Sequence, residues 1–370
     1  MINKEISMKK SNCFLSLILF LCLNQYLVWG ATIQPIERSV GKLKISIDPR
    51  IELLATIQLI SNYPQINRNL PYSKDVLKYF ENFSSQDAVK LTESLQQKYG
   101  FAYDAPVTFM LYLSQPHELE VHTELSDYLL GRSGGDDNLE QYRKSIKQFT
   151  EISNFEDFWN NKIPFYNQIL DMTIANMGEI DFVKTLEGYY NETKGSYNVI
   201  ISPAFIGGYA SWLSRTDGKD DLYSCLSTTN IKDNIPYLEE DNLLQLVWHE
   251  FGHSFVNPIT EKYAEKVKSI DKLLEPIKEE MSKQAYSQWY NCINEHIIRA
   301  VHVRLLALHV SSQQSNGLLN IELSKRFIYI EPLVEKLKDF EKRRDENNIT
   351  FSEFYPELLD VLNSLLAIEY

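Results

Sequence analysis

The sequence predicts an α+β fold that is predominantly helical, with a small mixed sheet placed ahead of one long helix. Three observations lead to this prediction. Apolar residues recur at helical spacing through most of the chain, the pattern changes to strand-like runs between residues 197 and 227, and 44% of the 370 residues are hydrophobic. A chain of this length can bury a large core. We therefore expect a mostly helical part over residues 31–190 and a second part over residues 191–370, packed together as one compact unit.

The first 30 residues have the pattern of a secretory signal peptide. Lysines precede an apolar run over residues 13–23, and Val28-Trp29-Gly30 offers a cleavage site before Ala31. The apolar run is short for an uncleaved membrane anchor, because a spanning helix needs roughly 20 residues. We therefore expect a protein exported to the periplasm or the extracellular space, with no stable membrane span after cleavage.

Charge and cysteine content limit the classes of protein that fit. The chain has 37 Lys and Arg against 50 Asp and Glu, and a net charge of −13 provides no basic surface for nucleic acid or for an anionic membrane. Cleavage after residue 30 would leave two cysteines, Cys225 and Cys292. Two cysteines form no disulfide framework, and the sequence leaves open whether they are bridged or are separate buried thiols.

The predicted elements of the first part are mainly helices. Residues 44–47 read as a short strand, and a helix is expected over residues 49–61, where apolar residues recur at helical spacing. Further helices are expected over residues 149–177 and 180–190. Gly134-Gly135 breaks the helical pattern, so residues 131–138 are expected to form a surface loop.

A change of period marks the predicted sheet and the helix behind it. Residues 197–202, 204–212 and 222–227 read as strands, with a bend or bulge at Pro203 and Gly207-Gly208. A helix is then expected over residues 242–256, with Asp241 as its N-cap and with Asn257-Pro258 ending it, since proline cannot continue the hydrogen-bond ladder. Later helices are expected over residues 282–310, 333–347 and 351–370.

His249-Glu250-Phe251-Gly252-His253 is the strongest motif in the chain. Residues i and i+4 lie on one helical face, so both imidazoles can bind a single Zn²⁺ with the intervening carboxylate beside the open coordination position. The alternative is a solvated surface helix that carries the motif by chance. That alternative is disfavoured by the apolar neighbours Leu243, Leu244, Leu246, Val247, Trp248 and Phe255. We predict that His249 and His253 bind zinc and that Glu250 is the general base.

A catalytic zinc site needs a third protein ligand, because three such ligands and one water are the usual set. Glu295 is the best candidate, since it lies in a strongly helical, otherwise apolar stretch where a carboxylate needs a partner. Arg299 and His302 extend the same helical face and could support the ligand or the transition state. The alternative is a Glu295–Arg299 ion pair without a metal. Other possible ligands after His253 are Glu261, Glu265, Glu275, Glu279, Glu280, His296 and His302.

Together these residues predict hydrolysis assisted by one zinc ion. Zinc lowers the pKa of a bound water to about 7, and Glu250 takes the proton as the water attacks a carbonyl group. The donor that stabilises the oxyanion is left open among Tyr209, Tyr223, Arg299 and His302. A peptide or protein is the expected substrate. Activity should fall below roughly pH 6, where protonated histidines no longer bind metal.

The motifs resemble two groups of proteins. An HExxH motif followed by a glutamate on a later helix resembles the gluzincin branch of the zincin metallopeptidases. The segments VWHEFGHSFVNP, ISPAFIGGYASW and NEHIIRA, with residues 47–54, are more similar to an uncharacterised family of exported bacterial proteins that is catalogued as a domain of unknown function. This likeness covers most of residues 42–310.

The resemblance implies a zincin-like fold in which His249, His253 and Glu295 bind one zinc ion and Glu250 is the base. Zincins commonly place an edge strand beside the substrate, and residues 204–212 have that place in the chain order. The chain departs from familiar gluzincins at Arg299, which stands where an aspartate is expected. A family without assigned activity also allows a second interpretation, in which the zincin fold is a non-catalytic binding or envelope-structural module.

Overall fold

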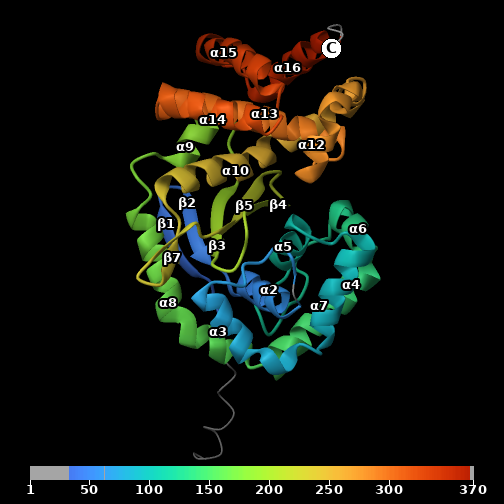
Figure 1. Ribbon diagram of the computed structural model, residues 1–370, viewed down its shortest axis with the longest axis vertical. Coiled ribbons are helices and arrows are strands. Elements are labelled where there is room, and N and C mark those ends of the chain that lie inside the picture. Colours follow the sequence, from blue (N-terminus) through green and yellow to red (C-terminus); the bar gives the residue numbers. More distant parts are fainter. Residues whose placement is uncertain (1–32, 62, 367–370) are drawn as a thin grey trace, which may run out of the picture. The chain divides into compact units, whose positions relative to one another are not determined.

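The computed structural model describes residues 33–61 and 63–366, and Figure 1 shows how their helices and strands are arranged. The expected α+β class is confirmed, because helices predominate and surround one small mixed sheet. The expected signal peptide, residues 1–30, lies outside the described residues. Among the helices that are described, none is long and apolar enough to cross a lipid bilayer.

The sheet has five strands in the order β1-β2-β3-β5-β4. Strands β2, β3 and β5 are parallel to one another, and β1 and β4 are antiparallel strands at the two edges. Because β2 pairs with β3, a single sheet joins the first part of the chain to the second. The bounds are β1 Ile36–Val40, β2 Leu43–Ile47, β3 Ser196–Ser202, β4 Gly208–Ser214 and β5 Asp220–Ser227.

Helices α2 and α5 lie against one side of the sheet and α10 lies against the other (Figure 1). Helix α2, Pro49–Ile60, follows β2 directly, and the Asp48 side chain caps it by accepting a hydrogen bond from the backbone N–H of Arg50. The Arg50 guanidinium pairs with Asp48 and donates to the carbonyl oxygen of Leu113, just after α5, Asp104–Leu111. This buried ion pair fixes α5 against the start of α2.

Helix α10, Glu240–Lys262, lies between the sheet and α13, Trp289–His309, and α13 is covered in turn by α14 and α15 (Figure 1). Further helices of the first part are α3 Pro71–Tyr79, η1 Glu81–Phe83, α4 Asp87–Tyr99, α6 Asp127–Ser133, α7 Asp136–Ile152, α8 Phe155–Ala175 and α9 Phe182–Tyr190. Those of the second part are α11 Ala264–Lys268, η2 Asp271–Ile277, α12 Lys278–Lys283, α14 Ser312–Ser324, α15 Ile330–Asn347 and α16 Phe351–Leu365.

The prediction that Asn257-Pro258 ends the α10 helix is wrong, and so is Asp241 as its N-cap. The helix starts two residues earlier, after Glu239, and continues through the proline to Lys262. Pro258 is exposed, whereas Ile259 and Thr260 on the following turn are buried. The Thr260 hydroxyl bonds within the helix and to side chains of α13 and α16. Tertiary contacts therefore hold the last turn in place although proline removes one backbone hydrogen bond.

Two predicted long helices are each divided in the structure. Residues 149–177 are split at Asn154, which has a left-handed φ of 55°, so that α7 ends and α8 begins there. Residues 282–310 are split at Ala285, whose φ is 70°, so that α13 begins only at Trp289. The expected loop over residues 131–138 is reduced to Gly134-Gly135 between α6 and α7. Apolar periodicity does not reveal one residue in the left-handed region.

The predicted strands are confirmed in place, but their bounds differ. Residues 204–207 form a turn, so β4 begins at Gly208. The sequence interpretation missed β1 and the separate hairpin formed by β6, Asn230–Lys232, and β7, Ile235–Tyr237, which are short and largely solvent-facing. Cys225 and Cys292 are both buried and unpaired, which answers the question that the sequence left open.

Candidate metal centre

Helices α10 and α13 bring the three predicted ligands together. The Nε2 atoms of His249 and His253 are 3.3 Å apart, and the Glu295 carboxylate lies 3.5 Å from the first and 3.4 Å from the second. The close approach of the helices depends on Gly252, because a β-carbon there would lie 3.1 Å from Ile298 of α13. Within the described part of the chain, these three residues form the one group of metal-binding side chains whose ligand atoms lie within 4.8 Å of one another.

The separations fit a tetrahedral ion. Zinc binds histidine nitrogen and carboxylate oxygen at about 2.0–2.1 Å, and a tetrahedron of that size separates its ligands by roughly 3.3 Å. The observed 3.3, 3.4 and 3.5 Å agree with this value before any ion is considered. The residues therefore fit a zinc ion in both donor chemistry and spacing.

The two histidines differ in their hydrogen bonds and in the direction of their pKa shifts. The Nδ1 atom of His253 lies 3.3 Å from Oδ1 of Asn257, one turn further along α10, so Nδ1–H can donate and Nε2 stays free to bind a metal. Burial lowers the pKa of His249 well below its usual value. Burial also disfavours the charged form of His253, but the hydrogen bond and charge of Glu295 outweigh it, so the pKa of His253 is raised. His249 is therefore neutral at ordinary pH, whereas Glu295 favours the protonated form of His253 when no metal is bound.

Glu250 lies beside the ligands but is not one of them. Its side chain is buried against the start of β4, where a β-carbon on Gly208 would lie 2.6 Å from Oε1. Burial raises the pKa of Glu250 to about 7, and the negative charges of Glu295 and Asp104 add to the rise. A carboxyl group whose pKa is near neutrality can both accept and release a proton at that pH, as a general base must.

Arg299 connects Glu295 to a second buried carboxylate. Its guanidinium lies 2.9 Å from Glu295 and, in the other direction, 2.9 Å from Glu322 of α14. The group is also stacked 4.3 Å above the Phe327 ring. Burial raises the pKa of Glu295, but the nearby histidines and Arg299 lower it by more, so the carboxylate stays ionised. The structure thus contains both the predicted ligand cluster and the Glu295–Arg299 ion pair that the sequence offered as its alternative.

Two histidines of α13, His296 and His302, lie outside this cluster. His302 is buried with its ring edge-on to Trp248, and burial lowers its pKa to about 3. His296 points to Phe327 and Tyr329, with its Nδ1 atom 2.7 Å from the carbonyl oxygen of Cys292. Both rings are therefore neutral packing groups at ordinary pH. The remaining sequence candidates for the third ligand also lie outside the cluster, namely Glu261, Glu265, Glu275, Glu279 and Glu280.

The two tyrosines named from the sequence are on the face of the sheet that α2 covers. Tyr223 lies beside Arg50, which partly offsets the effect of burial and leaves the pKa of Tyr223 at about 12. Tyr209 pairs in register with Cys225 on that face, and its hydroxyl donates to the carbonyl oxygen of Ile206. Glu250 still contributes to the raised pKa of Tyr209, after burial and two other tyrosines. Of the two tyrosines, Tyr209 is therefore the one whose hydroxyl is affected by the charge of Glu250.

Sequence reasoning missed two residues that interact electrostatically with the centre. Tyr286 lies in the turn before α13, within hydrogen-bonding reach of Arg299, and its pKa is raised by burial and then by Glu295. Asp104 is the first residue of α5. Its negative charge interacts with His253 and contributes to the raised pKa of Glu250. Neither position carries a sequence signal, because Tyr286 is one of 22 tyrosines and Asp104 approaches only through the packing of α5 on β4.

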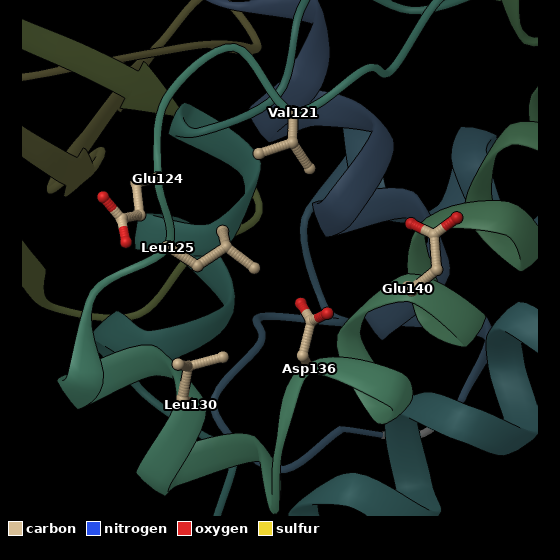
Figure 2. A pocket seen from close by; sticks show the side chains of 6 residues that line it. All are labelled: Val121, Glu124, Leu125, Leu130, Asp136 and Glu140. Carbon is tan, nitrogen blue, oxygen red and sulfur yellow. The ribbon is translucent and has the colours of Figure 1, made fainter.

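A hollow of about 420 Å³ lies elsewhere, between the segment before α6 and the start of α7. Figure 2 shows Leu125 and Asp136 pointing toward it, whereas the Glu124 carboxylate points to the other side. None of the ligand-cluster residues lines it. Its other acidic residue, Glu140, is already bound by Arg143, which lowers the pKa of Glu140 to about 2. The hollow is therefore separate from the candidate metal centre.

Comparison with protein families gives one match that covers most of the described residues. A family described as "Domain of unknown function (DUF4932)" matches residues 43–361, a range that includes the three clustered ligands and Glu250. Searches of curated proteins and of solved structures each found no significant match. The chain therefore belongs to the DUF4932 family.

Proposed function

We propose that this chain is an exported zinc metallopeptidase that hydrolyses peptide bonds with Glu250 as general base. One observation carries the proposal, which is the convergence of ligand atoms from His249, His253 and Glu295 at 3.3–3.5 Å beside a buried carboxyl group. Two histidines and one carboxylate, with a water in the fourth position, form a known ligand set of catalytic zinc.

The division of roles follows from the chemistry of each group. Zinc at this site would supply a Lewis acid that polarises a carbonyl oxygen and lowers the pKa of a bound water to about 7. Glu250 accepts the proton of the attacking water and returns it to the leaving amine, a role that suits its pKa of about 7. Gly208 leaves space for the Glu250 carboxyl group against β4 and so fixes where that proton is held.

The negative charge that develops on the carbonyl oxygen also needs a hydrogen-bond donor. The best candidate is the Tyr286 hydroxyl, because it lies close to Arg299, Glu295 and Glu250. The donors named from the sequence are less suitable. The Tyr209 hydroxyl already donates to Ile206, Tyr223 lies beside Arg50, and the His302 ring is buried against Trp248.

Strand β4 provides a surface for an extended peptide. It is an edge strand of the sheet, and its first residue contacts Glu250. A peptide that adds to an edge strand is held by backbone hydrogen bonds and runs along that strand. Its scissile bond then lies beside one residue of the strand. The start of β4 would place such a bond beside the base and the two histidines of α10.

The test is metal content together with hydrolysis. We expect the purified protein to retain about one zinc per chain after dialysis and to cleave unstructured protein, measured by mass spectrometry of the products. Glu250→Gln should keep the zinc and lose at least roughly 100-fold in turnover, because only the base is removed. Zinc with equal partner binding in both variants and no hydrolysis of peptides, esters or amides would favour the non-catalytic module instead.

The third ligand has its own matched control. Glu295→Gln should weaken zinc binding and abolish turnover, whereas Glu261→Ala and Glu279→Ala should keep both, since these carboxylates are exposed and outside the cluster.

Export is tested separately. N-terminal sequencing of the mature protein from the culture fluid or periplasm should begin at Ala31.

A further inference from the structure

Strand β4 has one edge that no other segment pairs with. It is the last strand of the sheet and is paired with β5 on its other edge (Figure 1). Within residues 33–61 and 63–366, the backbone of residues 208–214 forms hydrogen bonds with β5 and with no other segment. Alternate N–H and C=O groups of an edge strand point away from the sheet, so this edge can pair with one more extended chain.

The face of β4 that carries Gly208 is turned toward α10. A β-carbon on Gly208 would lie 2.6 Å from Oε1 of Glu250, and successive side chains of a strand point to opposite faces. Ala210 and Trp212 therefore lie on the same face as Gly208. A strand rises about 3.3 Å per residue, so Trp212 is about 13 Å along the open edge from the point where β4 meets the base.

A row of three side chains crosses the sheet on this face. Tyr197 of β3 is opposite Leu222 of β5, and Leu222 is opposite Trp212 of β4. Tyr197 and Leu222 are buried, and the Tyr197 ring lies 5.5 Å from that of Phe251 in α10. Trp212 ends the row at the open edge and is only half-buried. Its indole therefore keeps apolar surface that α10 does not cover.

An extended peptide on this edge would present every second side chain to the same face. Ala210 is small and leaves room for the peptide side chain that follows the one beside Gly208. The next side chain on that face, four positions from the one beside Gly208, would lie against the indole of Trp212. A half-buried indole is stabilised by an apolar or aromatic neighbour that removes its remaining surface from water.

We propose that Trp212 is a specificity residue that binds an apolar or aromatic side chain of the peptide substrate, four or five positions from the scissile bond. The inference rests on the proposed peptidase function. The direction in which the peptide runs along β4 decides whether this side chain precedes or follows the scissile bond. A solely structural role, in which the indole covers Leu222 at the edge of the sheet, would leave Trp212 without an effect on substrate choice.

The test uses one cleavable peptide and variants of it with Ala or Phe at each position on both sides of the cleaved bond. We expect kcat/KM to be roughly 10- to 100-fold higher for Phe than for Ala at one position, four or five residues from the bond. A peptide truncated just before that position should lose the same factor. The side on which the preference is found gives the direction of the peptide on β4.

Trp212→Ala should reduce the Phe-to-Ala ratio of kcat/KM at that position toward one, without changing kcat/KM for the Ala peptide. Trp212→Thr should do the same with a residue that favours strands, and it replaces Trp212→Ala if that variant does not fold. Leu213→Ala is the matched control. Leu213 is the next residue, is also half-buried and lies on the opposite face of β4, so its removal should leave the ratio unchanged.

Zinc content and melting temperature show whether the centre and the fold are retained in each variant. A wild-type enzyme with no preference for Phe four or five residues from the bond would overturn the role of Trp212 and leave the peptidase intact. A ratio that the Trp212 variants leave unchanged would do the same, and a dimer that these variants dissociate would then assign the edge to a second copy of the chain. A wild-type protein that cleaves no peptide of the set would overturn both proposals.

Discussion

Gly208 and Glu250 are in contact at the junction of β4 and α10, where a β-carbon on the glycine would lie 2.6 Å from Oε1 of the carboxyl group. Gly208→Ala should therefore displace the base while leaving the three ligands in place. We expect zinc content to be unchanged and kcat to fall roughly 10- to 100-fold, measured with one peptide substrate. Gly188→Ala, in α9 with open space around the new methyl group, is the control and should keep full activity. Loss of zinc in Gly208→Ala would show that the contact supports the fold of the centre instead.

Tyr286→Phe removes one hydroxyl beside Arg299 and Glu295. If the hydroxyl donates to the developing oxyanion, kcat should fall roughly 100-fold while KM and zinc content change little. Steady-state kinetics and metal analysis check this. Tyr209→Phe should have a smaller effect, because that hydroxyl is bound to Ile206. Equal effects of the two variants would argue that neither tyrosine is the donor.

Arg299→Met should remove the guanidinium that pairs with the buried carboxylates of Glu295 and Glu322, leaving Glu322 with Lys325 alone. Breaking a buried ion pair from one side typically costs about 3–5 kcal/mol, so we expect a loss of that order in urea unfolding of the metal-free protein. With zinc the loss should be smaller, since Glu295 regains a cation. Arg304→Met breaks a comparable pair with Glu341 away from the centre, and its loss should be the same with and without zinc. An Arg299→Met loss that zinc does not change would contradict a metal at Glu295.

The two motif histidines should titrate differently in the metal-free protein. Burial lowers the pKa of His249, whereas Glu295 raises that of His253 above its usual value despite burial. A proton on His253 competes with a metal, so zinc affinity should fall by up to tenfold per pH unit once the pH drops below the pKa of His253. Imidazole chemical shifts followed by NMR give the individual values, and chelator competition gives the affinity. Two histidines titrating together near 6.5 would refute the unequal environments.

Glu52 in α2 predicts a pH dependence of stability that has no connection with catalysis. Burial raises its pKa from 4.5 to about 7, although the Tyr72 hydroxyl donates to it. A carboxyl group whose pKa is raised by folding stabilises the fold below pH 4.5 relative to higher pH, and this contribution disappears as pH rises through 7. Glu52→Gln should thus be more stable than wild type by up to about 3 kcal/mol at pH 8 and similar at pH 4.

Urea unfolding at the two pH values measures the effect of Glu52→Gln. The exposed Glu279→Gln serves as the control and should show no such difference. If Glu52→Gln is destabilising at pH 8, folding does not raise the pKa of Glu52 and its ionised carboxylate is stabilised by its neighbours.

The part of this site that lies within one helix was predictable, and the part that depends on tertiary packing was not. His249, Glu250 and His253 follow from helical geometry alone. Glu295 could be ranked first because a carboxylate in an apolar helix needs a partner, but its distance from the histidines depends on the packing of α13 against Gly252. The same limit explains why α10 continues past Pro258 and why the edge strand β1 went unnoticed, since buried neighbours decided the first and β1 carries little apolar pattern.

The parallel pairing of β2 with β3 has a consequence for the order of folding. The middle of the sheet can form only when residues 196–202 are present to pair with residues 43–47. Glu295 is synthesised later still. Pairing between such distant segments is slow, because a long loop must close before its contacts are gained. A nascent chain that ends before α13 has both histidines but no third ligand. On this order of assembly, the candidate metal centre is completed only after α13 has been synthesised, near the end of the chain.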